Sequence, residues 1–382
     1  DPRGAAVARG TRMKIVVTGA SGFLGWHLRC RLHATTDHSV VAISRDTWGE
    51  LAAAVAECDA VIHVAGINRA DDDALSSGNA SLAHGVADAV VAADRPIRVV
   101  YANSVQSGND TAYGDGKQRA ADILRAATSS TGGSLVDVRL PNLFGEHGRP
   151  AYNSFVATFV AAAIAGDNPA IDDRDISLLH VQGAARALIE ALDSAESVVS
   201  PTATATSVGA VWSHLQRFQA TYVPSGDLPE LADDLELDLF NTYRAALFPT
   251  HYPIAFTPRA DQRGRLVETV RNHGSGGQTF VSTTVPGVTR GEHYHLRKIE
   301  RFVVLEGEAV IELRRMFTDE VLTFPVTGEA PAAIDMPTMW SHNITNTGDS
   351  ILTTLFWTDS LFDPDHPDTI PEPVRPVGQE QR

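Results

Sequence analysis

A glycine pattern near the start of the chain restricts the possible folds more than any other stretch. Residues 15–18 (Ile-Val-Val-Thr) form a short β-branched run, typical of a strand buried on both faces of a parallel sheet. Gly19, Gly22 and Gly25 follow at three-residue spacing and lead into a predicted amphipathic helix through Leu32. This order leaves free backbone N–H groups at a helix N-terminus, where a dinucleotide pyrophosphate binds. The sequence therefore predicts a dinucleotide-binding α/β domain.

The identity of the nucleotide depends on the end of the second predicted strand, residues 39–43, which is followed by Ser44, Arg45 and Asp46. An acidic residue there binds a ribose 2′-hydroxyl, whereas serine and arginine suit a 2′-phosphate. The pattern favours NADPH, but Asp46 leaves NADH open because a one-residue shift would bring its carboxylate within reach. The expected cofactor-binding residues at this stage are Gly19, Ser21, Gly22, Phe23, Leu24, Gly25, Ser44, Arg45, Ala65 and Gly66.

Strands and helices continue to alternate along this part of the chain. Residues 59–66 and 99–104 read as buried strands, with helical stretches such as 80–93 between them. Repeated alternation predicts a doubly wound parallel sheet. Since such sheets bind ligands at the carboxyl ends of their strands, Gly66 and Ser104 should lie near the glycine turn.

Three side chains after the strand at 99–104 suggest proton-transfer chemistry. Ser104 offers a hydroxyl, Tyr113 a phenol and Lys117 an ammonium four residues after the phenol, on the same face of a predicted helix. A neighbouring ammonium is expected to lower the pKa of Tyr113, and Ser104 could hold a carbonyl oxygen against it. The alternative is a solvated helix face, although the chain has only two other lysines, Lys14 and Lys298.

The composition changes near residue 250, from alanine-rich helix to short alternating runs rich in Thr, Val and Gly. Short strands with frequent turn signals predict a sandwich or jelly roll. We expect a disordered extension at 1–12, a nucleotide-binding domain at 13–250 and an all-β domain at 251–382. Within the last, His293 and His295 could share one metal, because alternate residues on a strand point the same way.

Charge and cysteine content exclude several classes of protein. The net charge is −16, with no local basic patch, which argues against a nucleic acid or an anionic membrane as partner. The sequence has no apolar run long enough to span a bilayer, and two cysteines make no disulfide framework. We therefore expect a cytoplasmic protein.

The first domain resembles the extended short-chain dehydrogenase/reductase family, which reduces, epimerises or dehydrates nucleotide sugars. The glycine pattern, Ser104, the Tyr113-x-x-x-Lys117 pair and the run Arg139-Leu-Pro-Asn-Leu-Phe-Gly145 carry the resemblance. It implies that Tyr113 is the proton donor, that Lys117 lowers its pKa and holds the ribose, and that Ser104 anchors the carbonyl. Tyr113 and Lys117 thus also count as cofactor-binding residues. Asn103 replaces a serine found in many relatives.

The second domain resembles the cupin superfamily in both of its motifs, His293-x-His295-x₄-Glu300-x₆-Gly307 and the later run from Pro337 through His342 to Asn346. The resemblance implies metal ligation by His293, His295, Glu300 and His342, with Met339 in place of the usual glycine. Such a ligand set suits Zn²⁺, Mn²⁺, Fe²⁺ or Ni²⁺, and we expect zinc. The alternative is a metal-free jelly roll with packed histidines.

The chain from Met13 to about Thr369 resembles the bifunctional reductase/epimerases of bacterial capsular polysaccharide synthesis, in the UDP-N-acetyl-L-fucosamine pathway. The resemblance implies homodimers, epimerisation at C3 of a UDP-linked 4-keto-6-deoxy-N-acetylhexosamine by the cupin domain, and reduction at C4 with NADPH. The residues that carry it include Ala65 to Arg69, Tyr152 to Ser154, and Phe362 to Pro364. Expected substrate-binding residues are Asn142 and, from a likeness to nucleotide-sugar 3,5-epimerases, Arg263 and Glu268.

Two alternatives stay open. A dTDP-linked 4-ketosugar could replace the UDP-sugar, or the protein could be a non-catalytic sensor of cofactor and sugar. The residue that moves the C3 proton is not evident, and Lys298 and His273 are the candidates.

Overall fold

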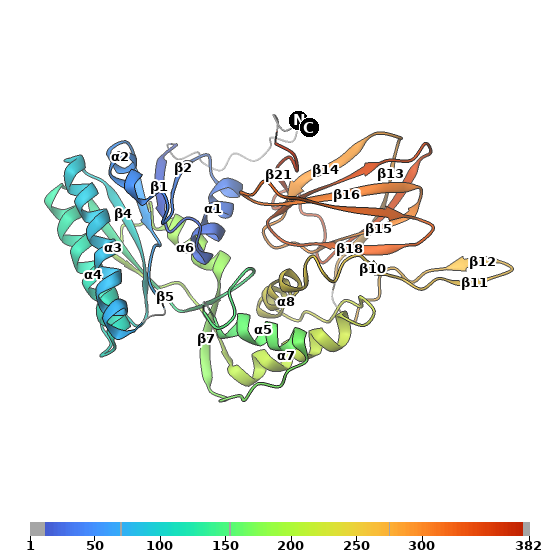
Figure 1. Ribbon diagram of the computed structural model, residues 1–382, viewed down its shortest axis with the longest axis horizontal. Helices are drawn as coiled ribbons and strands as arrows, with labels where there is room; N and C mark the ends of the chain where they lie inside the picture. Colours follow the sequence, from blue (N-terminus) through green and yellow to red (C-terminus); the bar gives the residue numbers. More distant parts are fainter. Residues whose placement is uncertain (1–11, 69–70, 153, 275, 377–382) are drawn as a thin grey trace. The chain divides into compact units, whose positions relative to one another are not determined.

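The structure is a computed structural model that describes residues 12–68, 71–152, 154–274 and 276–376 (Figure 1). Residues 1–11 of the expected extension at 1–12 lie outside the described residues, and so do Arg69 and Asn153. The chain forms two compact units: one runs to Thr158 and includes Asp172–Val208, and the other comprises Phe159–Ile171 and the chain from Gly209 on. Among the described residues, no helix is both long and apolar enough to cross a membrane.

The first unit is built on a parallel sheet of six strands within the described chain (Figure 1). In spatial order they are β2 (Ser39–Ile43), β1 (Lys14–Thr18), β3 (Ala60–His63), β4 (Arg98–Ser104), β5 (Ser134–Leu140) and β8 (Val198–Val199). Because the chain order reverses between β1 and β3, the carboxyl ends of these two strands flank a crevice suited to ligands.

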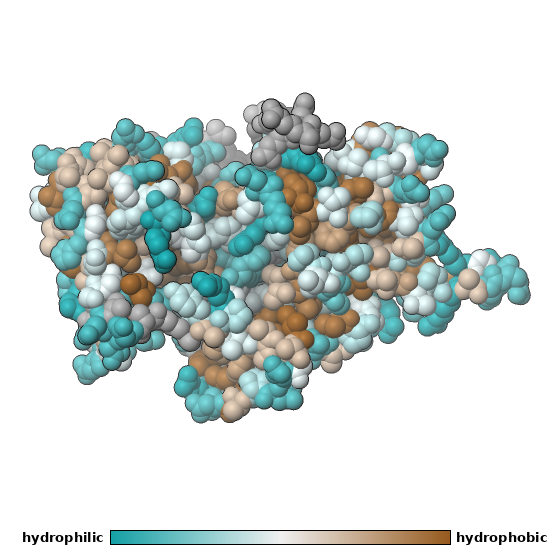
Figure 2. Space-filling view, in the orientation of Figure 1, coloured by the Kyte–Doolittle hydropathy of each residue, from teal (hydrophilic) through white to brown (hydrophobic). Residues whose placement is uncertain are grey.

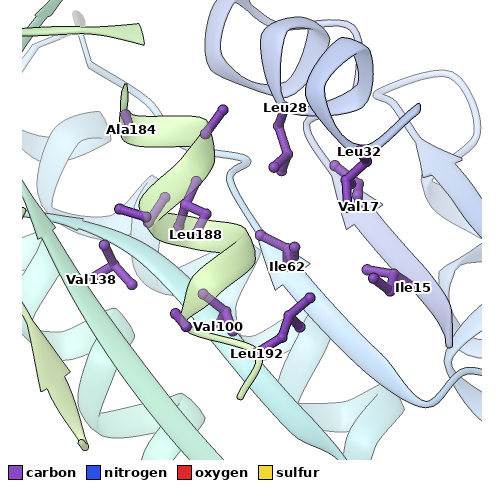
Figure 3. Close-up of a cluster of buried hydrophobic side chains, with 14 of the residues drawn as sticks. Ile15, Val17, Leu28, Leu32, Ile62, Val100, Val138, Ala184, Leu188 and Leu192 are labelled. Carbon is purple, nitrogen blue, oxygen red and sulfur yellow. The ribbon is translucent and has the colours of Figure 1, made fainter. Parts of the chain in front are cut away.

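Helices cover both faces of this sheet, and alternate residues of each strand pack on opposite sides. Ile15 and Val17 of β1 join a core with Leu28 and Leu188, whereas Val16 packs into the core on the other face (Figure 3). The first face carries α1 (Phe23–Thr35) and α6 (Val181–Glu190). The second carries α2 (Leu51–Ala56), α3 (Asp72–Ala93) and α4 (Ala112–Ser130), after a short 3₁₀ turn at Trp48–Glu50.

A smaller sheet completes the first unit. It contains β6 (Asn142–Phe144), β7 (Asp175–His180) and β9 (Thr204–Ser207). The helix α5 (Phe155–Ala165) precedes β7.

The second unit contains two antiparallel sheets of five strands each in the described part of the chain. One sheet has the order β10 (Ile254–Ala255), β18 (Ala332–Met336), β15 (Glu300–Glu306), β20 (Leu352–Thr358) and β13 (Gln278–Thr284). The other has β17 (Val321–Thr327), β16 (Glu308–Arg315), β19 (Trp340–Asn346), β14 (Thr289–Tyr294) and β21 (Ile370–Pro371). Their facing side chains, such as Phe302, Ile311 and Phe356, form a common core. The expected fold class, a doubly wound parallel sheet followed by an all-β cupin jelly roll, is confirmed.

Two helices extend the second unit beyond the expected boundary at residue 250. They are α7 (Val208–Tyr222), which the sequence analysis did not identify, and α8 (Asp234–Leu247). The buried phenol of Tyr222 donates a hydrogen bond to Asp335 on β18, and Arg301 on β15 pairs with the same carboxylate at 2.6 Å. Residues 209–250 therefore pack with the β-sandwich, through polar contacts that no local sequence pattern reveals.

The core beneath α6 gives a test of the fold. Leu188 is fully buried, so Leu188→Ala should lower the free energy of unfolding of the first unit by about 2–5 kcal/mol through lost burial and a cavity. Val91→Ala, at a position 49% exposed on α3, should change it by less than about 0.5 kcal/mol. Urea unfolding measures both, and equal effects of the two substitutions would contradict this packing.

Candidate functional site

The glycine turn between β1 and α1 leaves room for a ligand at the helix N-terminus. Gly19 has a φ of 67°, and a Cβ there would lie 2.7 Å from Cα of Ala65 after β3. A Cβ on Gly25 would collide with the carbonyl of Gly19. Gly22 caps α1 without a side-chain hydrogen bond, and Gly22 and Ser21 are both exposed, so no capping side chain covers the N-terminus of the helix. This is the geometry that binds a pyrophosphate.

The end of β2 presents a cation beside this turn. The backbone N–H of Ser44 donates to the hydroxyl of Thr47 at 2.9 Å, which bends the chain directly after the strand. Arg45 and Asp46 are both exposed. Among the described residues no side-chain hydrogen bond or ion pair engages the Arg45 guanidinium, so it can bind a phosphate.

The loop after β3 is held by a residue that the sequence analysis missed. Asn79 on α3 is buried, accepts a hydrogen bond from the Ile67 amide at 3.0 Å and donates to the Ile67 carbonyl. Gly66 lies beside this amide and also beside Lys117, whose Nζ would be 3.8 Å from a Cβ at Gly66. The structure thus brings the ends of β1 and β3 and Lys117 together, as expected.

Ser104 and Tyr113 meet at the carboxyl end of β4. Ser104 is the last residue of the strand and is 8% exposed, and its hydroxyl lies near the Tyr113 phenol, where it acts to lower the pKa of that phenol. Tyr113 lies in the first turn of α4, which Thr111 caps by accepting from the Gly114 amide at 3.0 Å. Asn103 supports the site, because its side-chain oxygen accepts from the Ser104 amide at 2.9 Å.

The expected effect of Lys117 on Tyr113 is not what the structure shows. Burial raises the pKa of Tyr113, and the hydrogen bond from Ser104 only partly offsets it. Burial also lowers the pKa of Lys117 to about 8, against the opposing charge of Asp137. The reason is geometric: the Lys117 ammonium donates to the Ala102 carbonyl at 2.7 Å and lies 4.7 Å from the centre of the Tyr101 ring. The Lys117 charge therefore interacts with the end of β4 and not with the Tyr113 phenol.

A second buried polar network in the first unit was also missed. His180, the residue before α6, lies 2.9 Å from Glu146, and His27 on α1 hydrogen-bonds the Glu146 carbonyl at 2.9 Å. Although burial raises the pKa of Glu146, the charge and hydrogen bond of His180 hold it well below its usual range. This network fixes the end of the segment Arg139–Gly145 against α1. Asn142 begins β6, is exposed and donates to the Ser177 carbonyl at 3.4 Å.

The second unit holds a cluster of three imidazoles around one carboxylate. Oε2 of Glu300 lies 3.0 Å from Nε2 of His295, 3.3 Å from Nε2 of His342 and 3.6 Å from Nε2 of His293. One ligand atom from each residue lies within 4.8 Å of all the others, so the four could hold one metal ion. Glu300, His295 and His342 are buried.

Hydrogen bonds on the far side of two rings determine where their lone pairs point. Nδ1 of His295 bonds the Asp368 carbonyl, and Nδ1 of His342 bonds the Trp340 carbonyl at 3.0 Å. Since a carbonyl only accepts, each Nδ1 carries the hydrogen, and a neutral ring then has a lone pair at Nε2. Burial lowers the pKa of His342 to about 4, which favours its neutral form. The Nε2 lone pair of His342 faces the anionic Oε2 of Glu300, and a cation between these two atoms would stabilise the arrangement.

Irregular backbone places these ligands. The pairing of β14 with β19 shifts register between Gly291 and His293, and Glu292 in this bulge has a φ of 61°. Such bulges redirect side chains. Met339 has a φ of 59°, so it adopts the left-handed conformation that glycine takes readily, and the four ligands still gather.

The side chains of the other candidates bond residues outside this cluster. Arg263 and Glu268 are exposed and pair with Asp261 and Arg259 of a hairpin, β11 (Arg259–Asp261) and β12 (Gly264–Leu266), that is exposed along both strands. Hydrophilic side chains cover the visible face of this hairpin (Figure 2). Nζ of Lys298 donates to the Pro367 carbonyl, and His273 pairs with Asp227 at 2.8 Å. No hydrogen bond or ion pair among the described residues links any of these side chains to the histidine cluster.

Comparisons with known protein families agree with this division. Residues 15–205 match the NAD dependent epimerase/dehydratase family, and residues 259–370 match the polysaccharide biosynthesis C-terminal domain. The first match covers the strands and helices that build the glycine turn and the Ser104–Tyr113 pair, and the second covers all four residues of the histidine cluster.

Relatives with the same two-part organisation also exist. The chain is 31% identical to UDP-2-acetamido-2,6-beta-L-arabino-hexul-4-ose reductase of Pseudomonas aeruginosa, over 94% of this chain and 98% of that one. The capsular polysaccharide assembling protein CapF of Staphylococcus aureus is 32% identical, with a TM-score of 0.61 over 94% of this chain and 100% of that one. A structure of CapF with the inhibitor 3-isopropenyl-tropolone is 29% identical, with a TM-score of 0.55 over 95% and 100%. The chain therefore belongs to the NAD dependent epimerase/dehydratase family, in the group of capsular polysaccharide reductase/epimerases that carry this second domain.

Proposed function

We propose that the first unit reduces the C4 ketone of a UDP-linked 4-keto-6-deoxy-N-acetylhexosamine. The observation that carries this is that Ser104 and Tyr113 lie close together at the carboxyl end of β4, in a unit whose glycine turn suits a dinucleotide. NADPH supplies the hydride. Ser104 orients the ketone oxygen and Tyr113 donates its phenolic proton to that oxygen, a transfer that its raised pKa suits because the phenol stays protonated at pH 7.

Lys117 has a positioning role in this proposal. Its buried ammonium is held at the Ala102 carbonyl and next to Gly66, in line with a contact to the ribose of the cofactor. Arg45 and Ser44 would bind the 2′-phosphate, and backbone amides at the start of α1 would bind the pyrophosphate, with Phe23, Leu24 and Ala65 lining the turn.

The second unit is proposed to epimerise C3 of the same ketosugar at a metal held by His293, His295, Glu300 and His342. Nitrogen and oxygen donors in this number suit Zn²⁺, and the orientation of two Nε2 lone pairs toward Glu300 supports the fit. The metal would act as a Lewis acid on the ketone, which makes the neighbouring C–H bond acidic. Hydrogen bonds to the Asp368 and Trp340 carbonyls orient the metal-ligating rings of His295 and His342, and burial of these side chains excludes water around them.

The substrate follows from the chemistry together with the relatives. A 4-ketosugar is a substrate for hydride reduction and also has an acidified C–H bond at C3, so one molecule serves both sites. The Pseudomonas aeruginosa relative is named as a reductase of UDP-2-acetamido-2,6-beta-L-arabino-hexul-4-ose. Sugar contacts by Asn142, Arg263 and Glu268, a cytoplasmic location and a homodimer stay predictions.

Tyr113→Phe tests the reductase. The substitution removes the proton donor but keeps the ring, so NADPH oxidation in the presence of UDP-4-ketosugars should fall by about 100-fold or more. Binding of NADPH, followed by its fluorescence, should persist. Tyr152→Phe, at an exposed tyrosine, is the matched control and should keep its activity. Full activity of Tyr113→Phe, or oxidation only with dTDP-4-ketosugars, would contradict the proposal.

Arg45→Ala tests the choice of nucleotide. A charge-assisted hydrogen bond is worth about 1.5–3 kcal/mol, so kcat/KM with NADPH should fall about 10- to 100-fold while kcat/KM with NADH stays nearly unchanged. Steady-state kinetics with both nucleotides measure this difference. Asp46→Ala is the control of opposite charge, and a loss confined to NADH in that variant would show that the carboxylate is the residue that binds the ribose.

His295→Ala tests the second unit independently of reduction. Exchange of the C3 hydrogen for deuterium in D₂O, followed by NMR, should disappear in this variant and after removal of metal by a chelator, and should return when Zn²⁺ is restored. In Tyr113→Phe the exchange should persist, because that residue acts only in reduction. Exchange that survives both His295→Ala and chelation would remove the metal from the mechanism.

A further inference from the structure

A segment near the C-terminus, Pro367–Val374, runs beside the histidine cluster. Its short strand β21 pairs antiparallel with β14, placing Pro371 opposite His293 and Ile370 opposite Tyr294. We call this segment the strap. It comes after the last long strand of the sandwich, β20, and is not needed to complete either motif that carries the cupin resemblance.

Asp368 is the main contact of the strap with the cluster. Its carboxylate accepts backbone hydrogen bonds from Leu296 at 2.8 Å, Arg297 at 2.9 Å and Lys298 at 2.7 Å. Its backbone carbonyl accepts from Nδ1 of His295. One residue therefore fixes the loop between His295 and Glu300 and also the ring orientation of His295.

The strap also bonds residues next to the other ligands. Glu292, which precedes His293, accepts from the Val374 amide at 2.6 Å, and the Ser341 hydroxyl, next to His342, donates to the Glu372 carbonyl. Lys298, two residues before Glu300, donates to the Thr369 hydroxyl at 2.9 Å. The strap thus contacts the chain within two residues of every member of the cluster.

We propose that the strap is a positioning element that sets the metal affinity of the cluster, and that Asp368 is its central residue. This inference rests on the metal site proposed above. Partners of the non-coordinating imidazole nitrogen fix the ring and its tautomer, and losing them typically weakens binding about 10- to 100-fold. Because coupling is reciprocal, a metal bound at the cluster must also stabilise the strap.

The test uses the full chain and Zn²⁺ alone, titrated in competition with a fluorescent chelator. Asp368→Ala keeps the backbone carbonyl that bonds His295 but removes the carboxylate that holds residues 296–298, so that carbonyl loses its fixed position and Zn²⁺ binding should weaken by about 10-fold or more. The matched control is Asp365→Ala, an exposed carboxylate three residues earlier whose side chain accepts no hydrogen bond among the described residues, and its affinity should equal that of the unsubstituted protein. Lys298→Met, which keeps the aliphatic stem but loses the bonds to Pro367 and Thr369, should weaken binding in the same direction.

Hydrogen exchange in the unsubstituted protein tests the reciprocal effect. Zn²⁺ should slow deuterium uptake at the amides of residues 296–298, which bond Asp368, and this measurement does not depend on the folding of any variant. Failure of the unsubstituted protein to bind Zn²⁺ would overturn the metal site itself. Tight binding with unchanged exchange, or with equal affinities for Asp368→Ala and Asp365→Ala, would overturn the role of the strap alone.

Discussion

The second unit depends on one electrostatic constraint, a carboxylate buried among three imidazoles. A buried charge is costly unless it is paired or coordinates a metal, and among the described residues no lysine or arginine forms an ion pair with Glu300. Its compensation must come from protons on the histidines or from a metal. The carbonyls of Asp368 and Trp340 take the Nδ1 hydrogens of two of these rings, so their Nε2 atoms are left to bind a cation.

The first unit depends on a different constraint, because the Tyr113 phenol and the Lys117 ammonium are both largely buried near the end of β4. Burial raises the pKa of Tyr113, so the phenol is neutral at pH 7, and lowers that of Lys117 to about 8, which still leaves the lysine mostly charged at pH 7. The Lys117 ammonium is stabilised by the Ala102 carbonyl and the Tyr101 ring, and not by the Tyr113 phenol. A phenol that stays protonated is suited to give a proton to a reduced ketone, which is the direction that the proposed reaction requires.

Local patterns predicted those features that depend on a few neighbouring residues. The glycine turn follows from three glycines between a strand and a helix, and the resemblance of two motifs to the cupin superfamily implied the gathering of His293, His295, Glu300 and His342. Contacts between distant segments were not predictable in this way. The Glu146–His180 pair joins residues 34 positions apart, and Asp368 reaches residues about 70 positions earlier. The prediction that Lys117 lowers the pKa of Tyr113 failed because helical spacing shows that the two side chains are near each other. It does not show which acceptor the flexible lysine ammonium bonds.

In the proposed function the two sites act on the same sugar substrate, so they do not need to form one shared pocket. Reduction and epimerisation both begin from the same C4 ketone, and reduction removes the carbonyl that makes the C3 hydrogen acidic. Epimerisation must therefore precede reduction on any given sugar, whatever the arrangement of the two units. If both proposed sites are active, one chain supplies the two activities in equal amounts, and the long-range contacts of Asp368 would hold the proposed metal site ready for the earlier step.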